Sequence, residues 1–442
     1  MKIDSRHLII RLLLVVLLPG LGTNLRGQPA EGDYVSRKEY EELKQQMLLL
    51  KKELDEIKRQ NGMAAKPIAP PASPVARSGQ DAKETVSTPL PDVGLQELIP
   101  GTSKFHLAGF ADATFVSRNG SVSNFSATFN PIFLWELSPK LLFEGRLEIE
   151  PSGGGTNLEL EYAQLTYLLN DYIAFGAGEF LTPSNVFVER FEALWINKLP
   201  DRPLAVYDGI LPERSFGLQV RGGIPLGPLR ANYAFYVSNG PNLNAFDAAR
   251  AGTLEFNNFS DNNDDKAFGG RIGFLPLPGV EVGYGFETAK PGTARSSFAQ
   301  VRSLLQSVDL NITRNSELLK GRIDLHAQYA WSEVDRAVYD PTGDLGFGPL
   351  SFESKRDGGY AQIAYRPTMV PVDFFRSLEL IVRWDHLSRA PSGLGAPQEE
   401  RWTLGLDYWL APSTTLKLAY EWDNPRGQPN TNALFFQAVM GF

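Results

Sequence analysis

The sequence contains no cysteine, so disulfide bonds, thiolate metal sites and a lipid-bearing N-terminal cysteine are all excluded. Its formal net charge is -8, which argues against nucleic acid as a partner. Hydrophobic residues make up 43% of the chain. Beyond Ala30, however, no apolar run reaches the ~18 residues that a membrane-spanning helix needs. Glycine (41) and proline (31) are frequent, as in proteins whose many short strands are joined by turns.

The first residues have the composition of an export signal. Basic residues precede a short apolar run, Leu12–Leu18, which is followed by Pro19 and Gly20. This pattern predicts a signal peptide over residues 1–27, because the run is too short to span a bilayer as a helix. A retained anchor helix is the alternative.

A coiled coil is predicted over residues 33–61, followed by a linker rich in proline and alanine over residues 62–100. Glutamate at heptad position g precedes lysine at position e by five residues, which favours parallel, in-register copies of the chain. A single solvated amphipathic helix is the alternative. The apolar residues are spaced alternately by three and four positions: Tyr40, Leu43, Met47, Leu50, Leu54 and Ile57.

From Lys104 onward the hydrophobic period changes to two, which is typical of β-strands. The stretch NFSATFNPIFLWEL, for example, has aromatic and aliphatic residues at every second position from Phe125, with polar residues between them. Sixteen such segments are counted. The residues around 157–182 and 298–312 could be assigned to either face, so this number could change by two.

Two all-β architectures fit this alternation. In a soluble sandwich the apolar faces of two sheets meet, and the strands are shorter. In a transmembrane antiparallel barrel the apolar face contacts lipid, the polar face lines a wet lumen, and aromatic residues gather at the strand ends. Tight joints such as Ser138–Lys140 also alternate with long ones such as 183–213, 239–266 and 333–357. We therefore expect residues 101–442 to form an outer-membrane barrel of about sixteen strands, preceded by the short α-helical coiled coil.

The last residues, NALFFQAVMGF, alternate in the same way and end at Phe442. A barrel has to pair its last strand with its first, because unpaired backbone groups are not tolerated in lipid. The closing aromatic residue resembles the C-terminal signal by which bacterial barrels are handed to the barrel-assembly machinery.

Residues 104–442 resemble the bacterial general and phosphate-selective porins, which are sixteen-stranded homotrimers. The coiled coil and the stretch AGEFLTP (Ala177–Pro183) are similar to the phosphate-selective porin O and P group. The resemblance implies a homotrimer in outer-membrane lipid, with the coiled coil in the periplasm and in possible contact with the cell wall.

In sixteen-stranded porins the third external loop folds into the barrel and narrows it. By the strand count, residues 183–213 are that loop, and charged groups there would set the selectivity of a constriction. The alternative is that Phe191, Leu194, Trp195 and Ile196 pack on a neighbouring subunit. The candidate constriction residues are Glu189, Arg190, Glu192, Lys198, Asp201, Arg202 and Asp208.

The facing pore wall is expected to carry charges of both signs, which would place an electric field across the pore. Many of these charges could equally be lumen residues that pair with one another, and the sign of the selectivity cannot be derived. The candidate wall residues are Glu144, Arg146, Glu148, Arg221, Arg230, Arg322, Asp324, Arg383 and Asp385.

The sequence therefore predicts a porin that passes small hydrophilic solutes or ions, with no catalytic residues, metal or cofactor. A structural tether between outer membrane and cell wall is the main alternative. Two other hypotheses are weaker. Asp261–Lys266 has part of a calcium-loop spacing but lacks its glycine and its final acid. His386 and Ser388 share a strand face but have no surrounding hydrolase motif.

Overall fold

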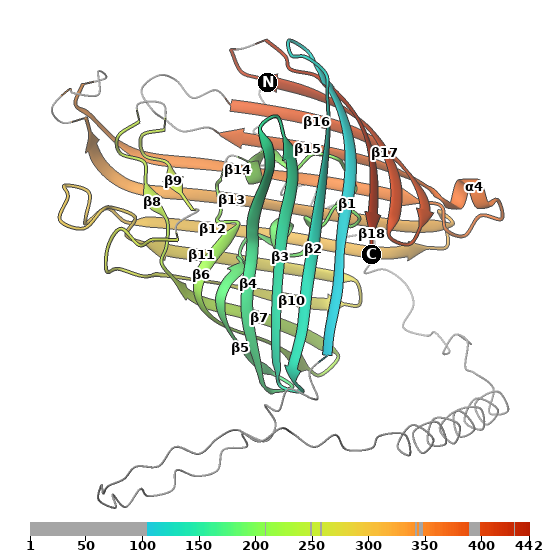
Figure 1. Ribbon diagram of the computed structural model, residues 1–442, viewed down its shortest axis with the longest axis horizontal. Helices are drawn as coiled ribbons and strands as arrows, with labels where there is room; N and C mark the ends of the chain where they lie inside the picture. Colours follow the sequence, from blue (N-terminus) through green and yellow to red (C-terminus); the bar gives the residue numbers. More distant parts are fainter. Residues whose placement is uncertain are drawn as a thin grey trace, which may run out of the picture. The chain divides into compact units, whose positions relative to one another are not determined.

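The computed structural model describes residues 104–442, apart from 208, 248–249, 257–258, 341–342, 344–347, 389–397 and 428. The predicted signal peptide, coiled coil and linker lie outside these residues, as does Asp208. The described chain is almost entirely antiparallel sheet (Figure 1). Its barrel strands are β1 (Lys104–Arg118), β2 (Asn124–Ser138), β3 (Leu141–Ser152), β4 (Gly155–Asn170), β5 (Ile173–Leu181), β6 (Arg214–Leu226), β7 (Leu229–Ser238), β10 (Ala267–Leu277), β11 (Val280–Ala289), β12 (Ser303–Ser316), β13 (Gly321–Tyr339), β14 (Leu350–Arg366), β15 (Leu378–Ser388), β16 (Gln398–Ala411), β17 (Thr414–Pro425) and β18 (Ala433–Gly441).

The strands form one closed barrel in which each strand pairs with its neighbour along the chain and β1 pairs with β18. The predicted sixteen strands are confirmed. At the closing seam Phe110 lies opposite Gly441, and Ala113 lies opposite Ala438. Gly109 and Phe442 extend the seam by exchanging two backbone hydrogen bonds of 3.0 and 2.9 Å. Closure leaves no edge strand in the barrel, as a lipid-spanning sheet requires.

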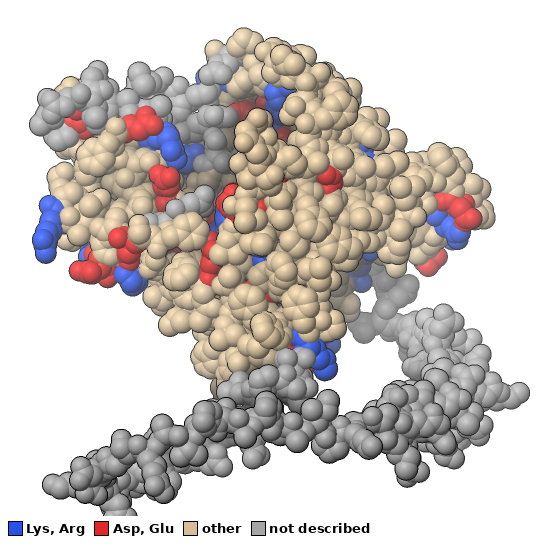
Figure 2. All heavy atoms as spheres, in the orientation of Figure 1, with Lys and Arg blue, Asp and Glu red and all other residues tan. Residues whose placement is uncertain are grey.

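The outward face of the barrel is apolar and the inward face is polar, which confirms the predicted inside-out pattern. On β18, Phe436 is 48% exposed, whereas the neighbouring Gln437 faces inward and is 3% exposed. On β16, Leu404 and Leu406 are exposed on the outward face, whereas Thr403 and Asp407 at the alternate positions are buried. The wall on view in Figure 2 is accordingly largely free of Lys, Arg, Asp and Glu. Such a surface is suited to contact with lipid tails.

A β-bulge explains why the face assignment near residue 160 was ambiguous. The register between β3 and β4 shifts at Arg146/Leu147, so that Glu161 has no partner of its own in β3. An inserted residue reverses the alternation that follows it. Glu161 and Tyr162 can therefore both be buried while Leu160 and Leu165 are exposed.

Most of the long connections lie at one end of the barrel and most of the short ones at the other, as predicted. The exceptions are the two-residue turn between β3 and β4 at the long-loop end and residues 367–377, which include α4, at the short-turn end. One boundary was wrong: residues 333–357 are not all loop, because β13 continues to Tyr339 and β14 begins at Leu350. These strands extend by further pairing, including Val338 with Ser351. A two-stranded sheet, β8 (Asn242–Leu243) and β9 (Leu254–Glu255), lies within the connection between β7 and β10.

The helical segments are short: a π-helix η2 (Phe187–Phe191), α3 (Leu204–Tyr207) and α4 (Asp373–Arg376). Among the described residues no helix has the length and apolar character to cross a bilayer. The largest buried apolar cluster lies at the long-loop end. There α3 and Ile210 pack with loop residues such as Leu254 and Phe298 against the inner wall at Leu305 and Val334. This cluster fills the part of the lumen beside β12 and β13.

Candidate functional site

The connection from β5 to β6, residues 182–213, folds into the lumen of the barrel. Its two ends are held together by a hydrogen bond of 2.9 Å from the Thr182 amide to the Glu213 carbonyl. We call this pair of residues the neck of the loop. Just inside the neck, the carbonyl of Ser184 accepts hydrogen bonds from Ser307 (2.9 Å) and Gln328 (2.8 Å). These two residues lie on β12 and β13, so the loop crosses to the opposite wall as soon as it leaves β5.

The π-helix η2 presents an apolar face to that wall. Phe187 packs edge-on against Tyr360, with ring centroids 5.7 Å apart, and Phe191 lies over the imidazole ring of His326 at 4.2 Å. Phe187 and Val188 are buried in this cluster. The charged residues of the same turn, Glu189 and Arg190, consequently point away from the cluster into the remaining space.

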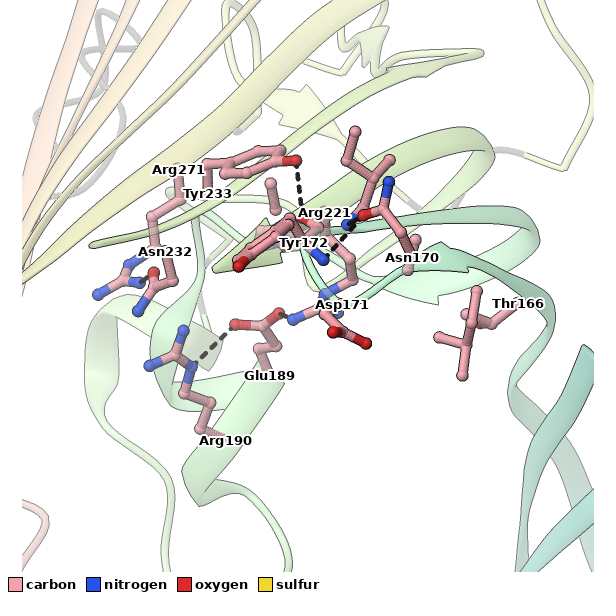
Figure 3. A pocket seen from close by; sticks show the side chains of 16 residues that line it. Thr166, Asn170, Asp171, Tyr172, Glu189, Arg190, Arg221, Asn232, Tyr233 and Arg271 are labelled. Atoms are coloured by element: carbon pink, nitrogen blue, oxygen red, sulfur yellow. Dashed lines mark hydrogen bonds and ion pairs between the residues drawn. The ribbon is translucent and has the colours of Figure 1, made fainter. Parts of the chain in front are cut away.

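Glu189 and Arg190 make ion pairs with two different wall strands. Glu189 accepts a hydrogen bond of 2.7 Å from Arg221 on β6, and Arg190 donates to both carboxylate oxygens of Glu281 on β11, at 3.0 and 2.9 Å. Arg190 also pairs with Glu189 at 3.1 Å. Figure 3 shows Glu189 lying between the two arginine side chains.

A second group of ion pairs joins the loop to β3. The Arg146 guanidinium donates to Glu161 at 2.8 Å and to Glu192 of the loop at 3.0 Å, and all three side chains are buried. Arg202 pairs with Glu192 and also, at 3.3 Å, with Glu213. Glu213 lies outside the membrane-spanning strands, and its burial raises the pKa of its carboxyl group although Arg202 opposes this shift.

The second half of the loop is fastened to the far wall. Lys198 pairs with Glu379 (2.6 Å) and Asp324 (3.4 Å), and Asp201 pairs with Arg401 (2.9 Å). The buried ammonium group of Lys417 donates to the carbonyls of Leu194 and Asn197, at 2.6 and 2.5 Å. Arg383 similarly donates to the Asp201 carbonyl at 2.9 Å. This half of the loop therefore fills the lumen beside β15–β17.

The space left beside the loop lies along β4–β7 and β10. One cavity of about 330 Å³ opens between Glu189, Arg190 and the short β4–β5 turn, and is lined by Tyr172, Tyr233 and Arg271 among others. A second cavity, of about 180 Å³, is lined by Glu144, Tyr162, Gln164 and Leu181. Glu189, Arg190 and Arg221 line both cavities, so these three residues lie where the two spaces meet.

Most of the predicted residues lie inside the barrel, but in different surroundings. Glu189, Arg190, Glu144 and Arg221 border the cavities, whereas Glu192, Lys198, Asp201 and Arg202 fasten the loop to the wall. Of the predicted wall residues, Arg146, Asp324, Arg383 and Asp385 are buried in ion pairs. Arg322 pairs with Asp324 at 3.0 Å, Glu148 is half-buried, and Arg230 is exposed at the short-turn end of β7.

Several residues of the site were not predicted. The strand alternation places Glu281, Arg271, Arg401 and Lys417 on the inward face, but only the path of the loop shows which of them it contacts. Glu161 was not recognised as an inward-facing residue, because the bulge reverses the alternation of the strand there. The alternative for the apolar loop residues was packing on a neighbouring subunit. Two of these residues instead pack within the same chain: Phe191 on His326, and Trp195 on Phe110 with ring centroids 5.3 Å apart.

The structure also bears on the two weaker hypotheses, the calcium loop at Asp261–Lys266 and the hydrolase site at His386 and Ser388. In the Asp261–Lys266 segment, Asp261 pairs with Lys266, and Asp265 pairs with Lys290 at 3.2 Å, so lysines neutralise these acids. Across the described residues no cluster of His, Asp and Glu is arranged to hold a metal ion. His386 is buried, with Nε2 at 3.7 Å from Asp357.

The sequence matches no protein-family model and no curated protein. Among solved structures, the fold is similar to that of a loop L8 deletion mutant of OmpT, an outer membrane protein of Vibrio cholerae, with a TM-score of 0.50 and 12% identity over 77% of this chain and 99% of that chain. An anion-selective porin from Comamonas acidovorans gives a TM-score of 0.49 and 12% identity, over 77% of this chain and 100% of that one. At 12% identity, the likeness to the OmpT variant shows the fold alone.

Proposed function

We propose that this chain is an outer-membrane porin that lets small hydrophilic solutes or ions diffuse through a water-filled barrel. The observation that carries the proposal is the loop 182–213. It lies inside a closed barrel with a lipid-compatible surface, yet leaves polar space lined by Glu189, Arg190 and Arg221. A loop that narrows a lumen and lines the remaining space with charge is how a diffusion pore limits the size and charge of its solutes.

The proposal includes a homotrimer in the outer membrane, inserted by the barrel-assembly machinery, with the N-terminal region in the periplasm. The predicted coiled coil would hold three chains together or contact the cell wall. Cross-linking of the protein in native membranes tests this part, and loss of the trimer on deletion of residues 33–61 is the expected result.

Single-channel recording in planar bilayers tests the central proposal. Discrete, voltage-independent conductance steps are expected from the purified chain. A barrel that inserts into the bilayer but gives no steps would instead favour the structural tether, in which the barrel serves only as an anchor.

A further inference from the structure

The inward face of β3 carries a row of carboxylates. Glu144, Arg146, Glu148 and Glu150 occupy alternate positions, which places successive side chains roughly 6.6 Å apart along the strand. Glu144 lines the smaller cavity, and Glu148 and Glu150 continue the row from there toward the long-loop end of the barrel. The adjacent strand β4 adds Glu159 and Glu161 at the same height.

The cations near this row are already paired with other acids. Arg146 binds Glu161 and Glu192, Arg214 binds Glu159 at 2.6 Å, and Arg202 binds Glu192 and Glu213. Glu148 and Glu150 are both half-buried and make no hydrogen bond or ion pair with any residue that the structure describes. Arg146 and Arg202 attract Glu148 electrostatically but bind other acids directly, so this part of the inner wall carries more negative than positive groups.

The inner wall at β16 and β17, four strands from β3 at its nearer edge and contacted by the second half of the loop, also has more acids than bases. Glu421 of β17 is 0% exposed, and neither of its carboxylate oxygens has a hydrogen-bond partner among the described residues. Its ion pairs with Arg118, Arg383 and Arg401 are long, at 3.7–4.0 Å. The three arginines are shared with further acids in this region: Asp201, Asp385, Glu399 and Asp423.

On the short-turn side of the loop the charges balance. Arg190 and Arg221 face Glu189 and Glu281, and Arg271 pairs with Asp309 at 2.7 Å. The charged residues that line the two cavities are three arginines, Arg190, Arg221 and Arg271, and three acids, Glu144, Asp171 and Glu189, so a solute at their junction meets both signs. The excess of negative charge lies in the half of the lumen that opens toward the long loops. This excess would produce an electric field along the passage.

We propose that Glu148 and Glu150 make the pore selective for small inorganic cations over anions. This inference rests on the proposed porin function. An uncompensated negative charge in a low-dielectric-walled vestibule raises the local concentration of cations and excludes anions. One charge at about 10 Å from the ion path, in a water-like dielectric and screened by about 0.1 M salt, changes the ratio of cation to anion permeability about twofold.

Reversal potentials of the full chain in a planar bilayer with a KCl gradient test this inference. At about 0.1 M salt, where charges are felt over about 10 Å, a preference for potassium over chloride is expected. The double variant Glu148→Gln/Glu150→Gln should lower the permeability ratio about fourfold while channels still open. The matched control is Glu317→Gln/Glu353→Gln, which removes the same charge from exposed positions on a short turn and on β14.

The outcomes separate the two proposals. A wild-type pore that is unselective or prefers chloride overturns the inference about Glu148 and Glu150 but leaves the porin function in place. An unchanged ratio in the double variant, or an equal fall in the control, also overturns it. The absence of any conductance steps would instead contradict the porin function itself.

Discussion

Arg401 of β16 donates a hydrogen bond of 2.9 Å to Asp201 of the lumen loop, and both side chains are buried. The two residues are 200 positions apart in the sequence. Their contact is one of several that hold the second half of the loop against β15–β17. The loop thus has a fixed position in the lumen, and the cavities lie on the opposite side, along β4–β7 and β10.

Replacing Asp201 by asparagine leaves the Arg401 guanidinium without its closest acid in the loop. Breaking a buried ion pair costs about 3–5 kcal/mol, and part of this cost is avoided here because Asp423 lies 3.3 Å from the same guanidinium. We expect Asp201→Asn to free the loop for excursions, seen as more frequent brief closures in single-channel records. The control is Asp373→Asn, at an exposed position in α4. If brief closures are no more frequent than in the wild type, this ion pair does not hold the loop in place.

Arg190 borders both cavities, whereas Arg202 lies between Glu192 and Glu213. Neutralising either arginine leaves acids uncompensated near the passage, so Arg190→Gln and Arg202→Gln should each raise the preference for cations by about twofold. Reversal potentials measure this change.

The matched control for these changes is Arg376→Gln, which removes a positive charge from a half-exposed site in α4. If neither arginine variant differs from this control, the loop does not border the conducting path.

Closure of the barrel depends on a glycine. Gly109 has φ = 153° and exchanges backbone hydrogen bonds with Phe442, and a β-carbon there would lie 2.4 Å from the Asn130 carbonyl oxygen and 2.8 Å from the Phe442 ring. We expect Gly109→Val to prevent normal closure, because the backbone on both sides of the seam would have to move. Loss of the compact, heat-modifiable band in cold gel electrophoresis would report this failure. Ala113→Val is the control, since Ala113 lies on the same strand with an exposed side chain.

The sequence predicted the barrel well because alternation is a local signal that recurs in every strand. The face reversal at Glu161 could not be predicted, since a bulge is recognised only from the partner strand. The loop 182–213 could be located by its length and by resemblance. Its contacts could not, because Arg146, Arg401 and Lys417 are distant in sequence and many other inward charges have the same pattern. The apolar cluster around Leu305 likewise forms where loops that show no periodicity pack against strand residues.

Glu213 gives the passage a pH dependence that an ordinary glutamate would not. Burial raises the pKa of its carboxyl group above the usual value of about 4.3, so it gains a proton at a higher pH than an ordinary glutamate does. Protonation removes a negative charge beside Arg202, and the preference for cations should therefore decline at a pH above the ordinary glutamate range. Reversal potentials recorded from about pH 8 to pH 4 would show this decline.

The variant Glu213→Gln has already lost this charge at every pH. We expect it to show a lower preference for cations at neutral pH and a smaller change above the ordinary glutamate pKa, since position 213 can no longer gain a proton. Glu317→Gln, at an exposed turn, should retain the wild-type profile. If the Glu213→Gln profile coincides with that of the wild type, protonation of Glu213 does not act on the permeating ion, and the neck of the loop lies away from the passage.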